Sequence, residues 1–156
     1  MRSFFITDQK EIEEIIRQSQ ICFVGLKALD GSPYVLPMNF GYIDGNIVLH
    51  SAPEGTHLEC IEQDNRVCVT FCAGGKLRNQ HTDVACSYSM ESRSVLCKGQ
   101  VSFIEDDDEK IKYLNALMKN YSKREFTYSA PAVRNVKVWL VKVEETTARA
   151  VGQNYK

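Results

Sequence analysis

Apolar residues recur at a spacing of three and four positions in three parts of the chain, which is the pattern of an amphipathic helix. Each of these parts opens with an Asp or Thr that is followed three residues later by Glu, a capping-box pattern. The sequence therefore predicts helices over Asp8–Gln18, Thr56–Gln63 and Asp106–Tyr121.

Between these helices, apolar and polar residues alternate as in β-strands. The predicted strands are Ile21–Leu29, Tyr34–Gly41, Asn46–His50, Arg66–Ala73, Ser92–Ile104 and Val136–Glu144. Asp30-Gly31 and Asp44-Gly45 are hairpin turn signals, so the first three strands are expected to form a meander. Gly99 is expected to bend its strand, while Gly74–Asp83 is expected to be a surface loop.

The predicted order is α-β-β-β-α-β-β-α-β, with mostly hairpin connections between the strands. Such an order favours a mainly β fold, a six-stranded Greek-key split β-barrel with peripheral α-helices. No repeat, low-complexity tract or linker interrupts the sequence, so a single domain is expected over residues 1–156.

Charge and composition narrow the class of protein. The chain has 19 basic and 20 acidic side chains and a formal net charge of -1, which argues against nucleic acid as a partner. No apolar run is long enough to span a membrane, and Met1–Lys10 lacks the apolar core of a signal peptide. We therefore expect a cytoplasmic protein whose 6 cysteines are reduced thiols. No pair of them has CxxC spacing, and no metal site is expected.

The most informative segment for chemistry is Leu49–Glu59, where a strand leads through a polar loop to a helix start. Free backbone N–H groups and the helix dipole favour an anion at such a position, and a protonated His57 could add a hydrogen bond. The alternative is that Ser51 and Thr56 only cap the helix.

Three other side chains have both a functional and a structural interpretation. Arg93, near a strand start, could bind phosphate or carboxylate, or could form a surface salt bridge. His50 at a strand end is more often structural than catalytic. Trp139 could stack on a flat cofactor or pack in the core, as could a set of Tyr and Phe residues. This set is Tyr34, Phe40, Tyr42 and Tyr88. Motifs of serine hydrolases, P-loop enzymes and zinc proteases are absent from the sequence.

Taken together, several segments resemble the flavin-binding split-barrel superfamily, in the branch similar to nitroimidazole-resistance (Nim) proteins and related to pyridoxamine 5'-phosphate oxidases. These segments are Cys22–Gly25, Asp30–Tyr42, Leu49–Ala52, Asn65–Cys68 and Tyr88–Val95. The resemblance implies a homodimer with two FMN sites at the subunit interface.

The resemblance also implies roles for individual residues. The strand along the isoalloxazine ring comprises Pro37, Met38, Asn39 and Phe40. His50 and Ser51 match a strand-end pair that contacts the flavin and its phosphate tail. Thr56 and His57 match positions that commonly hold a basic phosphate ligand, from which His57 departs. The remaining matches are Arg93 and Ser94, close to the flavin, and Trp139, which is expected to approach the ring from the partner chain.

The reaction is left open by the fold. Thr146–Ala150 replaces the Arg-x-His by which pyridoxamine phosphate oxidases bind substrate, which argues against that activity. The leading hypothesis is an FMN-dependent oxidoreductase that reduces a nitroimidazole or similar flat acceptor. Its electron donor would be a reduced nicotinamide or another donor, and His50 would be the proton donor. The alternatives are a non-catalytic flavin- or haem-binding protein, with His50 or His81 as axial ligand, and a pyridoxamine 5'-phosphate oxidase-like enzyme.

Overall fold

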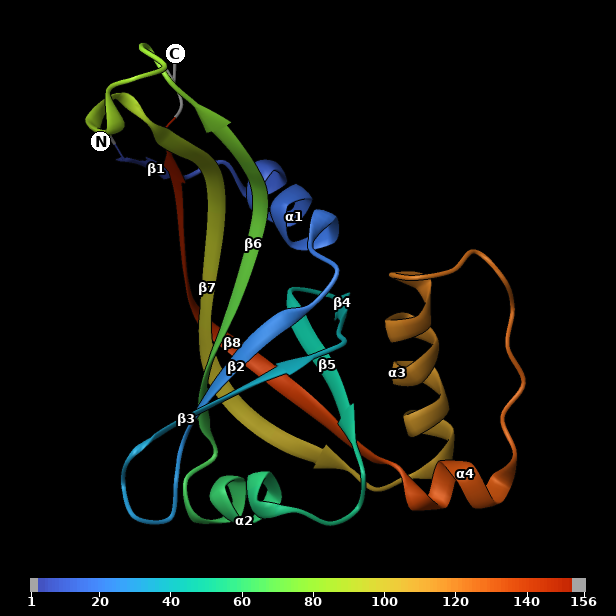
Figure 1. Cartoon of the computed structure of the whole chain (residues 1–156). Coiled ribbons are helices and arrows are strands. Elements are labelled where there is room, and N and C mark those ends of the chain that lie inside the picture. Colours follow the sequence, from blue (N-terminus) through green and yellow to red (C-terminus); the bar gives the residue numbers. More distant parts are fainter. Residues whose placement is uncertain (1–2, 153–156) are drawn as a thin grey trace.

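The structure of the chain is a computed structural model that describes residues 3–152. One antiparallel sheet forms its centre, with the strand order β3-β2-β6-β7-β8-β5-β4 and β1 added beside β8. The two strands at the ends of this order, β3 and β4, follow each other in the chain through Asn39 and Phe40. This link joins the ends of the sheet covalently and gives it the form of a barrel (Figure 1).

The strands are β1 (Ser3–Ile6), β2 (Cys22–Lys27), β3 (Pro33–Met38), β4 (Gly41–Ile43), β5 (Asn46–Ser51), β6 (Arg66–Arg78), β7 (Ser89–Ile104) and β8 (Lys137–Val151). The helices are α1 (Gln9–Gln18), α2 (Thr56–Gln63), α3 (Asp107–Lys119) and α4 (Ala130–Asn135), with a 3-10 turn at Ala85–Ser87. Helix α2 lies below the barrel, and α3 and α4 flank it on one side (Figure 1).

The prediction of a mainly β protein with peripheral helices is confirmed, but the strand count and the meander were wrong. The described residues form 8 strands instead of six. The predicted strand Tyr34–Gly41 divides at Asn39, because β3 pairs with β2 whereas β4 pairs with β5. The two hairpins therefore lie at opposite ends of the strand order.

Strands β6 and β7 are longer than predicted and form an arm, residues 74–92, that extends away from the barrel (Figure 1). The prediction of a loop over Gly74–Asp83 was wrong up to Arg78, because a bulge between Gly74 and Lys76 lets the pairing continue. Strand β8 also continues past Glu144, where β7 and β1 pair with it on both sides. The expected bend at Gly99 is confirmed by a register shift between Lys98 and Gly99.

The helix starts agree with prediction in two of three cases. The Asp8 carboxylate accepts a hydrogen bond from the Lys10 amide, and the Asp106 carboxylate accepts one from the Glu109 amide. The predicted cap of α2 was wrong, because Gly55 is its N-cap residue and no side chain makes a capping hydrogen bond. The segment 122–135 was expected to be a connection without a helix, and the structure shows that its last residues form α4.

Alternation along β8 divides the apolar side chains between two cores. Trp139 and Val141 pack inside the barrel, where Trp139, Phe40 and Phe71 are fully buried. Val138 packs on the other face, against Leu114 and Leu117 of α3. Among residues 3–152, no helix is long and apolar enough to cross a membrane.

Candidate functional site

The end of β5 and the start of α2 meet at one end of the barrel. The Trp139 indole N–H donates a hydrogen bond to Ser51 Oγ at 3.1 Å, and Ser51 Oγ donates to the Ala52 carbonyl at 2.9 Å. The His57 ring stacks on Trp139, with centroids 5.5 Å apart and planes at 28°. Ser51, His57 and Trp139 therefore form one cluster.

The start of α2 is shaped by Gly55. Its backbone φ of 139° lies in a region that residues other than glycine rarely adopt. A Cβ at this position would lie 2.6 Å from His57 Cε1, so the absence of a side chain makes room for the folded His57 ring. Because neither Ser51 nor Thr56 caps the helix, its first backbone N–H groups are available to an anion.

Two histidine nitrogens in this region are buried without a partner. They are His50 Nδ1 and His57 Nε2, in side chains that are themselves only half-buried. Burial lowers the pKa of both histidines, because it penalises the charged imidazolium. Burial therefore favours the neutral form of both rings, and each orphaned nitrogen is suited to a ligand that brings a hydrogen-bonding group.

The strand predicted to follow the flavin presents alternate side chains outward. Pro37 and Asn39 are exposed, whereas Met38 and Phe40 are buried in the barrel core. The Phe40 ring packs edge-on against Phe71, with centroids 4.8 Å apart. The prediction that Met38 and Phe40 contact a cofactor is thus limited to their backbone, because strand alternation turns their side chains inward.

The structure does not bring Arg93 and Ser94 to this cluster. Arg93 pairs with Ala150 in the sheet, whereas His50 and Ile104 both pair with Val138. The path along β7 from Arg93 to Ile104 is roughly 36 Å at about 3.3 Å per residue. Arg93 instead donates to Gln18 Oε1 at 2.9 Å and forms an ion pair with Glu11.

The expectation that Trp139 approaches a cofactor from the partner chain has to be corrected. Its side chain is fully buried inside its own chain, so it offers no surface to the flavin of a partner chain. Its contact with His57 and its hydrogen bond to Ser51 give it a supporting position under the β5 end. Its place in an alternating strand between apolar neighbours was the sequence signal for burial.

Sequence reasoning missed Lys137, which pairs with Ser51 across β5 and β8. Its ammonium group lies 4.9 Å from the Phe103 ring centroid and 2.6 Å from Glu105 Oε1. Lys137 is two residues before Trp139, so strand alternation indicated the shared face. The pairing with Ser51 could not be read from the sequence.

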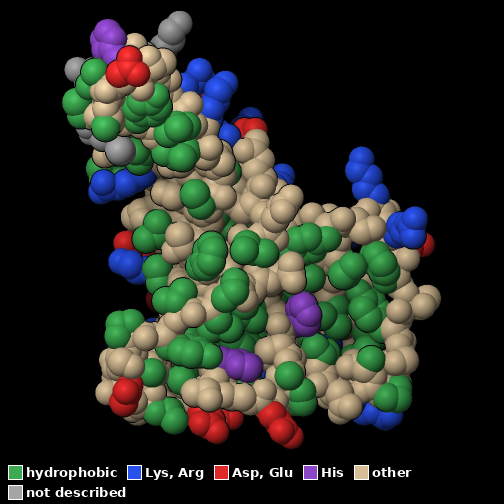
Figure 2. Space-filling view, in the orientation of Figure 1, with side chains coloured by type: hydrophobic (Ala, Val, Ile, Leu, Met, Phe, Trp, Pro, Cys, Tyr) green, Lys and Arg blue, Asp and Glu red, His purple; other side chains and the backbone are tan. Residues whose placement is uncertain are grey.

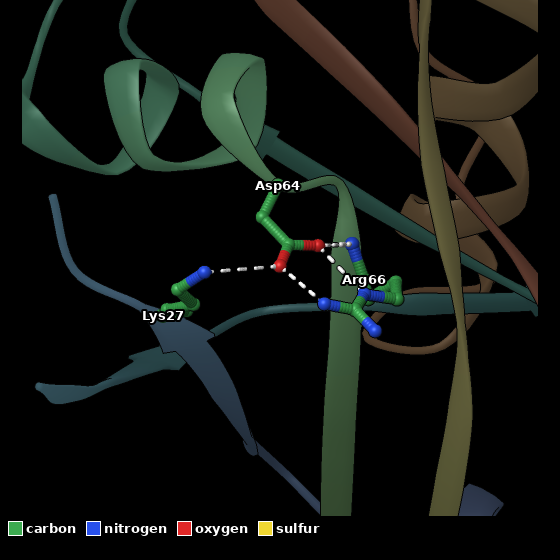
Figure 3. Close-up of polar contacts among 3 residues, drawn as sticks. All are labelled: Lys27, Asp64 and Arg66. Atoms are coloured by element: carbon green, nitrogen blue, oxygen red, sulfur yellow. Dashed lines mark hydrogen bonds and ion pairs between the residues drawn. The ribbon is translucent and has the colours of Figure 1, made fainter. Parts of the chain in front are cut away.

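A separate cavity on the barrel holds none of the predicted site residues. It has a volume of about 770 Å³ and is lined by Gly25, Lys27, Arg66, Lys98 and Glu145, among others. Asp64 binds both Lys27 and Arg66 beside it, at 3.7 and 2.6 Å (Figure 3). Hydrogen bonds from Arg66 hold the pKa of the Asp64 carboxyl well below its usual range. Since these basic side chains are already paired, we assign this cavity no function.

The closed antiparallel sheet with its peripheral helices defines a split-barrel protein. The family model of pyridoxamine 5'-phosphate oxidase matches residues 8–150, and the chain belongs to this family. No curated protein sequence matches the chain.

Solved structures extend the comparison. A proposed 5-nitroimidazole antibiotic resistance protein from Bacteroides thetaiotaomicron is 49% identical, with a TM-score of 0.89 over 96% of this chain and 88% of that chain. The FAD- and haem-binding protein from Mycobacterium smegmatis is 17% identical, with a TM-score of 0.83 over 96% and 74% of the two chains. The flavocytochrome Anf3 from Azotobacter vinelandii is 19% identical, with a TM-score of 0.79 over 94% and 68%. The last two show similarity of fold alone.

Proposed function

We propose that this flavin-family protein is a cytoplasmic, FMN-dependent oxidoreductase that reduces nitroimidazoles or similar flat electron acceptors with a reduced nicotinamide as donor. The observation that carries the proposal is the uncapped start of α2 beside the His50–Ser51 strand end, with unpartnered histidine nitrogens at both elements. The 49% identity to a proposed nitroimidazole-resistance protein supports the substrate class.

A bound flavin would supply the electron transfer. The amides that open α2 would hold its phosphate, and Ser51, fixed by Trp139, would border the tail. Pro37 and Asn39 would lie along the ring. His50 would hold a proton at its ring nitrogen. Burial lowers the pKa of His50, and a negative charge bound nearby would oppose this shift because it favours the protonated ring.

We also propose a homodimer, in which Arg93 and Ser94 of one chain reach the site of the other. The separation of these residues from His50 within one chain supports this arrangement. Large apolar side chains are exposed on the outer face of β2 and β3 and on the arm, as expected of an interface. They are Phe23, Val35, Leu77, Val84, Tyr88 and Met90. Figure 2 shows hydrophobic side chains on the arm and around the histidines of the same face.

An absorption spectrum of the purified protein tests the cofactor. We expect a flavin band, and chromatography of the flavin released on denaturation should identify FMN rather than FAD or riboflavin. NAD(P)H oxidation should then depend on an added nitroimidazole. A protein that binds no flavin after FMN is added would exclude the proposal.

Replacement of His50 tests the proton donor. His50→Ala should retain FMN but lower kcat for nitro reduction by 10²-fold or more, the usual contribution of a general acid. The control is His81→Ala, because His81 is exposed on the arm, where its backbone bonds with Ser87. Normal turnover by the flavin-loaded His50→Ala protein would remove His50 from the chemistry.

The second candidate function is haem binding. The names of two structural neighbours include haem or a cytochrome, and His50 Nδ1 lacks a partner. A Soret band that disappears in His50→Ala would favour this function over the first.

The pyridoxamine phosphate oxidase alternative lacks its substrate-binding motif, because the described residues provide no Arg-x-His at Thr146–Ala150. An assay for pyridoxal phosphate formation would decide whether the protein has this activity.

A further inference from the structure

The proposed phosphate site has an unusual charge balance around α2. The loop and first turn of this helix carry the acidic residues Glu54 and Glu59, and β5 contributes no lysine or arginine. Figure 2 shows acidic side chains along the lower edge of the molecule, where α2 and its loop lie. A phosphate dianion at this position would need a cation from another element.

His57 is poorly placed to be that cation. Its ring is folded between Gly55 and Trp139, and burial lowers its pKa, which favours the neutral form. To act as a cation it would have to gain a proton, and its position against Trp139 opposes that change because burial penalises the charged ring.

Lys137 reaches the same end of the barrel from β8. Its backbone pairs with Ser51, and directly paired residues direct their side chains to the same face. Phe103, under the Lys137 ammonium group, contacts Trp139 edge-on with centroids 6.1 Å apart. The side chains of Lys137, Phe103, Trp139 and His57 therefore form a continuous row from β8 to α2.

The partner that Lys137 has in this structure is replaceable. Glu105 binds it at 2.6 Å, but the Glu105 side chain is 69% exposed whereas that of Lys137 is 26% exposed. A salt bridge of this exposure contributes little to stability, so a phosphate dianion could displace the carboxylate.

We propose that Lys137 provides the cationic contact for the flavin phosphate, in place of a basic residue at Thr56 or His57. This inference rests on the proposed flavin function and assigns a residue to the site. Ser51 and the first amides of α2 would bind the phosphate from one side, and Lys137 would exchange Glu105 for it on the other.

Affinities for FMN and riboflavin test the proposal, because riboflavin lacks the phosphate. Both are measured by flavin fluorescence quenching on the apoprotein, and their ratio isolates the contribution of the phosphate. Lys137→Met should lower the FMN-to-riboflavin affinity ratio about tenfold, which is the scale of one charge-assisted hydrogen bond, and Lys137→Arg should restore most of it. The control Lys98→Met removes another ion-paired lysine of the same sheet, which binds Glu145 at 3.2 Å.

Glu105→Gln provides a test that misfolding cannot imitate. The substitution removes the carboxylate that competes with the phosphate for Lys137, so the FMN-to-riboflavin affinity ratio should rise a few-fold. The inference would be overturned if wild type bound FMN no more tightly than riboflavin, or if Lys137→Met left the ratio unchanged. Absence of binding of either flavin by wild type would reject the proposed function itself, and the inference with it.

Discussion

At the scale of single residues, the site depends on the contact between His57 and Trp139, the only tryptophan of the chain. Intrinsic tryptophan fluorescence therefore reports on the surroundings of this one side chain, which include the His57 ring. Gly55 permits the contact because it has no Cβ to meet the imidazole. The folded pKa values of His50 and His57 are lowered, so the unfolded chain binds protons at these positions more readily than the folded chain.

The free energy of unfolding should consequently decrease as the pH is lowered through a defined window. The histidine contribution is fully present above the unfolded pKa of about 6.5 and is lost as pH falls through it toward the lower folded values. Urea titrations between pH 7.5 and 5.5 should show a decreasing free energy of unfolding. The decrease should be smaller in His57→Gln, whose Trp139 fluorescence should no longer respond to pH. An unchanged pH dependence in His57→Gln would contradict this account, and His81→Gln is the control.

At the scale of elements, Tyr121 connects three parts of the fold just beyond the end of α3. Its hydroxyl accepts a hydrogen bond from the Phe40 amide at 3.0 Å and donates one to the Gln20 carbonyl at 2.9 Å. These bonds fix the link between β3 and β4 and the turn between α1 and β2. The same link directs Asn39 outward and Phe40 into the core.

Tyr121→Phe should destabilise the fold by about 1–3 kcal/mol, because it leaves the Phe40 amide and the Gln20 carbonyl without this partner. Chemical denaturation measures the loss. Tyr128→Phe, which removes a single hydrogen bond to Asn115, should cost less. Equal losses in the two variants would show that Tyr121 has no special role in the link.

At the scale of the whole molecule, the outer face of β2 and β3 and the arm expose apolar side chains that a second copy could cover. Phe23 and Val35 lie on this face, with Phe23 paired to Pro37 and Val35 paired to Gly25. They are 43% and 61% exposed. We expect this face to form part of the proposed homodimer interface.

A charged residue in this face should therefore disrupt assembly. Val35→Lys should shift sedimentation from dimer to monomer and lower FMN affinity, because Arg93 and Ser94 would be lost from the partner's site. The control is Phe126→Lys, on the connection between α3 and α4, at an apolar side chain that is 37% exposed. A Val35→Lys protein that remains dimeric would exclude this face as the interface.

Local patterns in the sequence were sufficient for the helices and most strands. The boundaries of α2 and the caps of α1 and α3 follow from short-range spacing and side-chain chemistry, which act between neighbouring residues. The family, and with it the mainly β fold, could also be identified from the sequence, because the motif segments are spread over most of the chain.

Long-range pairing was decided only by the tertiary structure. Lys137 joins Ser51 across 86 residues of sequence, and Arg93 lies far along β7 from His50, because antiparallel register is determined by the packing of whole strands. The division of Pro37–Phe40 into outward and buried side chains depends in turn on the barrel interior that Phe40 helps to fill. The sequence by itself therefore determined the candidate residues and the mainly β class of the fold, because both depend on local patterns. The tertiary structure decided which of these residues meet in one chain, because that depends on the register of whole strands.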